Sequence, residues 1–329
     1  MNMVKQNQFI EKGNQMERVK QIIRYHPVDA SGRMLTGKGV AAAILDTGIA
    51  GHPDLSGRIR LFKDFVHGKQ TMYDDNGHGT HVAGILAGNG ACGGASGIAP
   101  EAEIVALKVL DETGNGKIRQ VIAGIRFLLS IQKVYKIRIV NISVGTLPHP
   151  KDFEEKRLLY WVEKMWDQGL IVVVAAGNLG PGKGSITVPG NSRKVITVGA
   201  FHETKDRPYS GRGPAGECVV KPDLLAPGTG VMSCGHQFAK GQFYQKKSGT
   251  SMATPVVSGA AALLVQGSPG MSGQEVKRRL WDCCDDLGMP LNVQGRGLLN
   301  IEKLCQEKTL DKEWKVGYSN IGDSQWMKY

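Results

Sequence analysis

The chain lacks any apolar run long enough to span a membrane. Its first 17 residues are polar and contain no apolar core of the kind found in secretory signal peptides. No internal repeat is present either. We therefore expect a cytoplasmic protein that is not inserted in a membrane and is not built from repeated units.

Cysteine is sparse and shows no pattern that would bind a metal or build a disulfide framework. The six cysteines include no C-x-x-C pair, and the adjacent Cys283 and Cys284 are poorly placed for a set of disulfides. Cysteines of cytoplasmic proteins are normally reduced. We therefore expect six free thiols and no zinc site.

Acidic residues are outnumbered by basic ones. There are 30 Asp and Glu against 41 Lys and Arg, which gives a formal net charge of +11. The basic residues are scattered, with only short clusters such as 277–279, and no aromatic residues are interleaved with them. This pattern is typical of a solvated surface rather than a nucleic-acid-binding stripe. We expect no nucleic-acid partner, and the sequence leaves the oligomeric state open.

Apolar segments of two kinds alternate along the chain. Short runs bounded by Gly or Asp predict strands, and longer segments with helical spacing predict helices. The run 171–174 is unbroken rather than alternating, which indicates a strand buried on both faces. The pattern predicts an α/β fold with a mostly parallel central sheet and helices on both faces. The expected strands are 40–45, 104–110, 138–144, 170–175 and 195–199, and the expected helices are 82–87, 118–134, 153–168, 251–266 and 272–283.

The chain offers no linker strong enough to divide its central part. We expect a short N-terminal extension over residues 1–30, with helical spacing in 16–25. One catalytic domain should follow over 31–305. The charged, irregular residues 306–329 then form a C-terminal tail that we expect to lie on the surface.

Four polar residues stand where an expected strand ends or an expected helix starts. Asp46 follows the strand 40–45, and Asn178 follows the strand 170–175. His78 lies between two glycines just before a helix, and Ser251 begins a helix of small residues. Each has an ordinary explanation if taken alone, as a turn or a helix cap. Together they supply a carboxylate, a base, a hydroxyl and an amide donor for an oxyanion, which are the parts of nucleophilic catalysis by serine.

A metal site at the histidine is a weaker alternative. His78 and His81 form an H-x-x-H pair, whose spacing suits one face of a helix, but no third ligand stands out nearby. We therefore favour a catalytic role for His78 and predict no metal there. The order Asp, His, Ser along the chain is the order found in subtilisin.

Four motifs carry a resemblance to a known family. They are LDTGI at 45–49, DDNGHGTHVAG at 74–84, AAGN at 175–178 and SGTSMATP at 248–255. Over about residues 36–305 the chain resembles the subtilisin-like (S8) serine proteases, and segments such as 221–228 look most like their intracellular AprX-type branch. The resemblance implies a three-layer subtilisin-like fold and a serine endopeptidase that acts on protein or peptide substrates.

The resemblance also implies a role for each residue. Ser251 is the nucleophile, His78 the general base and later the general acid, and Asp46 orients the imidazole. The Asn178 amide and the Ser251 backbone N–H form the oxyanion hole. Because the residue after Asn178 is the apolar Leu179, we expect apolar or aromatic residues at the substrate position P1. The residues expected to flank the substrate are Gly114, Asn115, Gly116, Ser143, Val144, Gly145, Ala176 and Gly177.

The match to the family weakens at two places. Many relatives bind calcium through the loop that corresponds to 88–96, but here that loop is poor in oxygen ligands, and Asp54 alone does not make a site. We expect no required cofactor and no tight calcium at this loop, with calcium elsewhere left open. A G-x-G-x-x-G match in the same loop follows a helix rather than a strand, so it does not predict a dinucleotide site. Residues 1–30 are also too few to form the folded pro-domain of extracellular relatives, although they could block the cleft.

Two other functions are compatible with parts of this pattern. A processing protease with one narrow target would keep the same chemistry. A pseudoprotease that only binds peptides would not need the intact set Asp46, His78, Asn178 and Ser251. We therefore favour a catalytically active endopeptidase.

Overall fold

The structure is a computed structural model that describes residues 16–146, 153–202, 208–214 and 219–306. The expected C-terminal tail lies outside the described residues except for its first one, and so does the start of the N-terminal extension. Among the described residues, no helix is both long enough and apolar enough to cross a membrane.

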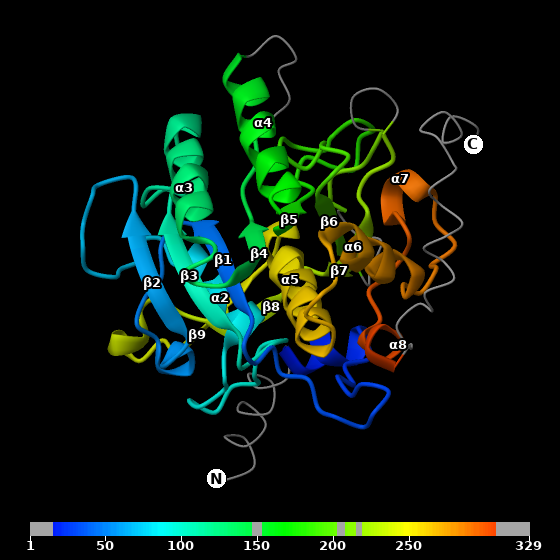
Figure 1. Ribbon diagram of the computed structural model, residues 1–329, viewed down its shortest axis with the longest axis horizontal. Helices are drawn as coiled ribbons and strands as arrows, with labels where there is room; N and C mark the ends of the chain where they lie inside the picture. Colours follow the sequence, from blue (N-terminus) through cyan, green and yellow to red (C-terminus); the bar gives the residue numbers. More distant parts are fainter. Residues whose placement is uncertain (1–15, 147–152, 203–207, 215–218, 307–329) are drawn as a thin grey trace, which may run out of the picture.

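A parallel sheet of seven strands forms the centre of the molecule (Figure 1). Its order is β2-β3-β1-β4-β5-β6-β7, so β1 lies between β3 and β4 in the interior of the sheet. Every residue of β1 and β5 is buried, as the unbroken apolar runs predicted. The strands are β1 Ala41–Asp46, β2 Ile59–Asp64, β3 Glu103–Lys108, β4 Ile137–Ile142, β5 Ile171–Ala175, β6 Ile196–Phe201 and β7 Leu224–Pro227.

Helices cover both faces of the sheet, so the predicted α/β fold is confirmed (Figure 1). On one face, α3 packs against α4, while on the other face α2 packs against the long helix α5. The larger helices are α2 His78–Ala87, α3 Ile118–Ile131, α4 Phe153–Asp167, α5 Thr250–Gly267 and α6 Gly273–Asp282. The short helices are η1 Pro53–Leu55, η2 Phe238–Lys240, α7 Leu291–Gln294 and α8 Ile301–Gln306.

A small antiparallel hairpin packs against α2. It consists of β8 Val231–Cys234 and β9 Tyr244–Lys247, and the segment after β9 leads directly into α5. The sequence patterns did not predict this hairpin, nor the strands β2 and β7. β2 and β9 are only partly buried and carry charged residues, so their apolar pattern is weak, and β8 has only four residues.

The described part of the N-terminal extension packs onto the domain. Residues 16–22 are helical, and Val19 and Ile23 are buried in the main core. The backbone N–H of Ile301 donates to Ile23 O, which ties this segment to the start of α8. Lys20 Nζ also donates to Ser96 Oγ in the loop after α2, at 2.8 Å. Residues 16–30 therefore form part of the same core as the sheet.

Candidate active site

Asp46 and His78 are held together at the carboxyl end of the sheet. Asp46 is the last residue of β1 and is 1% exposed, and His78 is the first residue of α2. His78 Nδ1 lies 2.7 Å from Asp46 Oδ1. Because a carboxylate only accepts hydrogen bonds, this contact places the proton on Nδ1 and leaves Nε2 as the basic nitrogen.

The charges around His78 set its proton affinity. Burial of the imidazole lowers the pKa of His78, but the charge of Asp46 and the hydrogen bond to it raise the pKa by more. The charge of Lys247 lowers the pKa of His78, and the charge of Asp74 raises it. The net result is a His78 pKa above the ordinary value, because the carboxylates stabilise the protonated imidazole.

Asp74 organises the start of α2, and sequence reasoning did not single it out. Its carboxylate accepts hydrogen bonds from the backbone N–H groups of Asn76, Gly77 and Thr80 and from the Thr47 and Thr80 hydroxyls. Burial raises the pKa of Asp74, but these hydrogen bonds lower it by more. Asp74 thus replaces the side-chain cap that Gly77, the N-cap residue, cannot provide.

Glycine at position 79 allows α2 to approach β1 closely. A Cβ at Gly79 would collide with the carbonyl oxygen of Gly48 and press on the side chain of Asp46. The Gly79 N–H instead donates to Thr47 Oγ1 at 2.9 Å. The glycine after His78 therefore sets the distance between the two residues that form the hydrogen-bonded pair.

Ser251 lies in the first turn of α5, where a proline changes the hydrogen bonding. Pro255 has no N–H, so the carbonyl of Ser251, four residues earlier, loses its helical partner. Ser143 Oγ fills this role and donates to Ser251 O at 3.1 Å. In return Ser251 Oγ donates to Ser143 O at 2.9 Å. Ser143, in the segment after β4, therefore contacts both the hydroxyl and the backbone carbonyl of Ser251.

Asn178 is oriented by the residue before Ser251. Its Oδ1 accepts hydrogen bonds from Thr250 N at 2.9 Å and Thr250 Oγ1 at 3.1 Å. Because the backbone N–H can only donate, the acceptor end of the amide must face Thr250. Asn178 Nδ2 is therefore the donor that remains for another ligand.

His78, Asn178 and Ser251 line one cleft of about 610 Å³. Of the residues expected to flank the substrate, Gly114, Ser143, Val144, Gly145 and Gly177 line it too. Asn115 and Gly116 continue the same loop, with Asn115 O accepting from Asp111 N. Ala176 is fully buried, and its carbonyl accepts hydrogen bonds from Thr187.

His81 has a structural role that is separate from the cleft. Its ring is fully buried, and Nε2 donates to Val231 O and Gln245 O in the β8–β9 hairpin, at 3.1 and 2.9 Å. Burial and then the charge of Lys247 lower the pKa of His81 to about 3. The second histidine of the H-x-x-H pair therefore attaches the hairpin to α2 in its neutral form.

The fold and the site define a class of protein. A parallel α/β sheet that brings a buried Asp–His pair, a serine at a helix start and an oriented amide donor into one cleft is the architecture of a serine hydrolase.

Comparisons with known proteins narrow this class to one family. The model of the subtilase family matches residues 37–297, and the chain therefore belongs to the subtilases, the family of subtilisin-like serine endopeptidases. The chain is 38% identical over 319 residues to "Serine protease AprX" of Bacillus subtilis (strain 168), covering 89% of this chain and 71% of that protein. It is 37% identical over 281 residues to "Subtilisin Savinase" of Lederbergia lenta, covering 85% and 96%.

Solved structures agree with this placement. The structure titled "Sphericase" superposes with a TM-score of 0.73 at 29% identity, covering 86% of this chain and 96% of that chain. The "S41 Psychrophilic Protease" superposes with a TM-score of 0.72 at 30% identity and the same coverage. The subtilisin-like fold expected from the motifs is thus confirmed.

Proposed function

We propose that Ser251, His78 and Asp46 perform peptide hydrolysis through an acyl-enzyme. The observation that carries this proposal is the 2.7 Å contact between His78 Nδ1 and Asp46 Oδ1, because it leaves Nε2 free to accept a proton in the cleft that Ser251 lines. The Ser251 hydroxyl turns from Ser143 O toward His78 and attacks the scissile carbonyl carbon as Nε2 takes its proton. His78 then donates this proton to the leaving amine, and water completes the cycle by hydrolysing the ester.

Two donors face the oxygen of the tetrahedral intermediate. One is Asn178 Nδ2, whose orientation follows from the bonds that Thr250 makes to Oδ1. The other is the Ser251 backbone N–H, one of the N–H groups in the first turn of α5 that have no partner within the helix. The positive end of the helix dipole adds to their effect on the developing oxyanion.

The experiment that tests these roles uses a serine-directed fluorophosphonate. Wild-type protein should be labelled on Ser251 and should lose peptidase activity in parallel with labelling. Ser251→Ala should abolish both labelling and turnover while the far-UV circular dichroism spectrum stays unchanged. Full activity in purified Ser251→Ala protein would remove Ser251 from the mechanism.

We also propose a preference for apolar or aromatic P1 residues. Leu110, Val144, Ala175 and Leu179 contribute apolar surface to the cleft, and among its described lining residues there is no carboxylate that would pair with a basic P1 side chain. A panel of tetrapeptide substrates should be cleaved fastest with Phe or Leu at P1. Fastest cleavage after Lys or Arg would contradict this preference.

We further propose that catalysis needs no cofactor and that the loop 88–96 does not hold calcium. Asp54 packs against this loop and can offer it a single carboxylate, which accepts hydrogen bonds from Cys92 N and the Tyr244 hydroxyl. In the loop itself, Asn89 Oδ1 accepts from Ala91 N. Calcium prefers six to eight oxygen ligands, which this loop does not provide. Adding excess Ca²⁺ to metal-free protein should leave its Tm unchanged.

A cytoplasmic location is the proposal that the cysteines support. Five of the six cysteines lie in the described part of the chain, and each is a free thiol. Cys218 lies outside the described residues. Free thiols are typical of reducing compartments. Fractionation of cells that express the chain should recover the active protease with cytoplasmic markers, and recovery from the medium would contradict this location.

A further inference from the structure

A second cavity lies away from the catalytic cleft and is lined by sulfur. It has a volume of about 530 Å³ and is enclosed by the loop after α2, the end of β8 and the start of β9. Cys92, Cys234, Met16 and Met232 all contribute to its wall, beside the carboxylate of Asp54. Thiol and thioether sulfur favour soft and borderline metal ions over calcium or magnesium.

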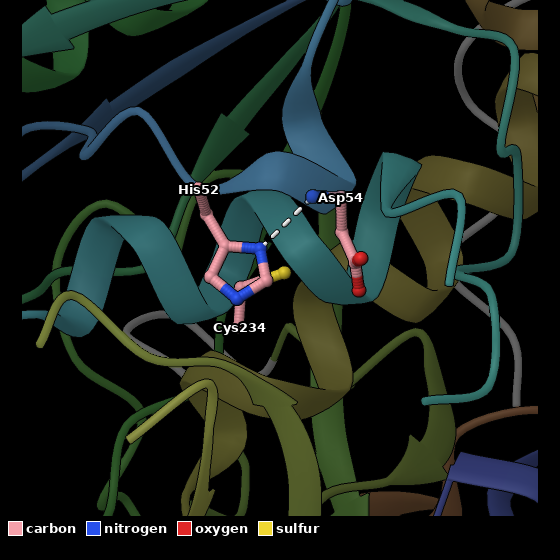
Figure 2. Close-up of side chains that lie close together, drawn as sticks. All are labelled: His52, Asp54 and Cys234. Atoms are coloured by element: carbon pink, nitrogen blue, oxygen red, sulfur yellow. Dashed lines mark hydrogen bonds between the residues drawn. The ribbon is translucent and has the colours of Figure 1, made fainter. Parts of the chain in front are cut away.

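Three potential ligand atoms meet beside this cavity (Figure 2). A ring nitrogen of His52, a carboxylate oxygen of Asp54 and Cys234 Sγ all lie within 4.8 Å of one another. His52 and Asp54 come from the segment of η1, and Cys234 approaches from β8 (Figure 2). The three residues are 1%, 1% and 2% exposed, so the cluster is shielded from water.

The hydrogen bonds of His52 leave Nδ1 as the ring nitrogen that can coordinate a metal. His52 Nε2 lies 2.8 Å from Phe243 O, and because a carbonyl only accepts, Nε2 carries the proton. Nδ1 therefore holds a lone pair, which in this structure accepts the backbone N–H of Asp54 at 3.0 Å. A ring N–H bound to a carbonyl, with the other nitrogen free to coordinate, is the usual arrangement of a metal-binding histidine.

Asp54 and Cys92 complete the set. The Asp54 carboxylate accepts hydrogen bonds from Cys92 N and the Tyr244 hydroxyl, and its roughly two other lone-pair positions remain for the Cys92 thiol and a metal ion. The Cys92 thiol is hydrogen-bonded to the same carboxylate. Cys92 Sγ is not among the three atoms that lie within 4.8 Å of one another, so its loop, which has Gly90 and Gly93 at positive φ, would have to shift to bring the thiol to a metal bound there.

We propose that His52, Asp54, Cys92 and Cys234 bind a thiophilic divalent cation, with Zn²⁺ as its physiological form. Two sulfurs, one nitrogen and one oxygen match the tetrahedral ligand sets of structural zinc sites. On binding, Zn–S bonds replace the two S–H bonds, the protons leave to solvent, and Nδ1 exchanges the Asp54 N–H for the metal. The ligands come from three separate segments, so the site has no C-x-x-C spacing in the sequence.

The site would join three segments that surround the second half of α2. The η1 segment, the 88–97 loop and β8 all contact that helix or follow directly from it. Bound zinc should therefore stabilise the folded state, since a ligand that binds only the folded chain raises the free energy of unfolding. The proposal does not depend on the roles assigned to the catalytic residues.

The test uses full-length protein prepared without metal in the Ser251→Ala background, which prevents self-digestion. Co²⁺ serves as the spectroscopic probe, because sulfur ligands give it a sulfur-to-metal charge-transfer absorption. No cysteine is among the described residues that line the catalytic cleft, so this absorption would not arise there. We expect one Co²⁺ per chain, displaced by one Zn²⁺, and a rise in Tm with Zn²⁺.

Variants distinguish this site from other binding. Cys234→Ser should abolish the charge-transfer absorption, and Tyr244→Phe, which removes one donor to Asp54, should weaken Zn²⁺ binding about 10–100-fold. Cys284 is a free thiol elsewhere in the fold, so Cys284→Ser should change neither the charge-transfer absorption nor the Zn²⁺ affinity. His67→Ala should also have no effect, since it only alters the exposed cluster of His67, Asp75 and Glu112.

Three outcomes would overturn the proposal. The first is binding of Co²⁺ without a sulfur-to-cobalt charge-transfer absorption. The second is a Zn²⁺ affinity that His67→Ala lowers and Cys234→Ser leaves unchanged. The third is equal binding of Ca²⁺ by wild type and Cys234→Ser, which would make the place an oxygen-ligand site. Should Cys234→Ser fail to fold, as judged by near-UV circular dichroism, the Tyr244→Phe result decides alone.

Discussion

At the scale of single residues, the active site depends on partners that do not touch a substrate. Asn178 can donate to an oxyanion because Thr250 occupies the other end of its amide. Burial and Lys247 lower the pKa of His78, but the charge of Asp46, the hydrogen bond to Asp46 and the charge of Asp74 together raise it above the ordinary value. The orientation of Asn178 and the raised pKa of His78 therefore each depend on a neighbouring residue.

Replacing Asn178 by Ala should lower kcat about 10²–10³-fold, a range known from subtilisin itself, and should change KM little. The physical reason is that the amide acts on charge that develops only in the transition state. Steady-state kinetics on one peptide substrate measure both constants. Asn178→Asp offers a matched control, since it keeps the size and an acceptor for Thr250 but brings no N–H donor. A loss expressed mainly in KM would contradict the oxyanion role.

The pH profile reports on His78. His78 must be neutral to accept the Ser251 proton, so kcat/KM should fall as the pH drops through its pKa, which lies above the ordinary histidine value. Among the described residues, Asp46 and Asp74 raise this pKa and Lys247 lowers it. Lys247→Ala should therefore move the acid limb of the profile to higher pH.

Lys246→Ala provides the control for that shift. Lys246 is the neighbour of Lys247 on β9, and successive strand residues point to opposite faces. Both variants remove one positive charge from the molecule, but only Lys247 is close enough to act on His78. Equal shifts in the two variants would mean that net charge, rather than the local contact, sets the profile.

At the scale of secondary-structure elements, the joint between β4 and α5 holds Ser251, the proposed nucleophile. Pro255 withholds an N–H from Ser251 O, and Ser143 supplies an O–H instead. Asn141 Nδ2 donates to Ser143 Oγ, and Ser258 Oγ donates to Asn141 Oδ1. This chain of hydrogen bonds connects two turns of α5 to the end of the central strand.

Ser143→Ala should lower the free energy of unfolding by about 1–3 kcal/mol, because it leaves the Ser251 carbonyl without its partner. Pro255→Ala restores an N–H four residues after Ser251 and should relieve part of that loss. Urea denaturation of the two single variants and the double variant gives their coupling, which we expect at about 0.5–3 kcal/mol. Strictly additive effects would show that Ser143 does not substitute for the missing helical bond.

Much of this architecture follows from the sequence, and the exceptions have physical reasons. The buried strands were predictable, because unbroken apolar runs are a strong local signal. The set Asp46, His78, Asn178 and Ser251 came from the combination of motifs, because each of these residues taken alone looks like an ordinary turn or cap residue. The role of Asp74 was not predictable, since an acidic residue in a turn looks the same whether or not five donors surround it. The β8–β9 hairpin was missed because its burial depends on contacts with α2, which no local pattern reveals.

At the scale of the whole molecule, a buried ionic cluster lies where α6 meets the edge of the sheet. Asp223 is 6% exposed and contacts Lys221 Nζ at 2.6 Å and Lys277 Nζ at 3.3 Å. Burial lowers the pKa of Lys221 to about 8, although the Asp223 charge opposes this shift. The cluster therefore depends on a single carboxylate to compensate two buried ammonium groups.

Asp223→Asn should destabilise the fold by about 3–5 kcal/mol, because it leaves those cations without a compensating charge. Asp167→Asn is the matched control. Asp167 pairs with Lys194 at 2.8 Å, but both side chains are largely exposed, so we expect a change within about 1 kcal/mol. Urea denaturation in the Ser251→Ala background measures both, and similar effects in the two variants would contradict the importance of burial.

The hydrogen bond between Ile301 N and Ile23 O, described with the fold, bears on how well the protein resists cleavage by other molecules of the same protease. An endopeptidase can cleave other molecules of itself, and poorly ordered segments are the usual sites of cleavage. Here the segment around Ile23 is bonded to the start of α8, and Val19 and Ile23 are buried in the core. Cleavage within residues 16–23 or within α8 requires this contact to open first, so the joint should slow the digestion of these two segments by other molecules of the enzyme.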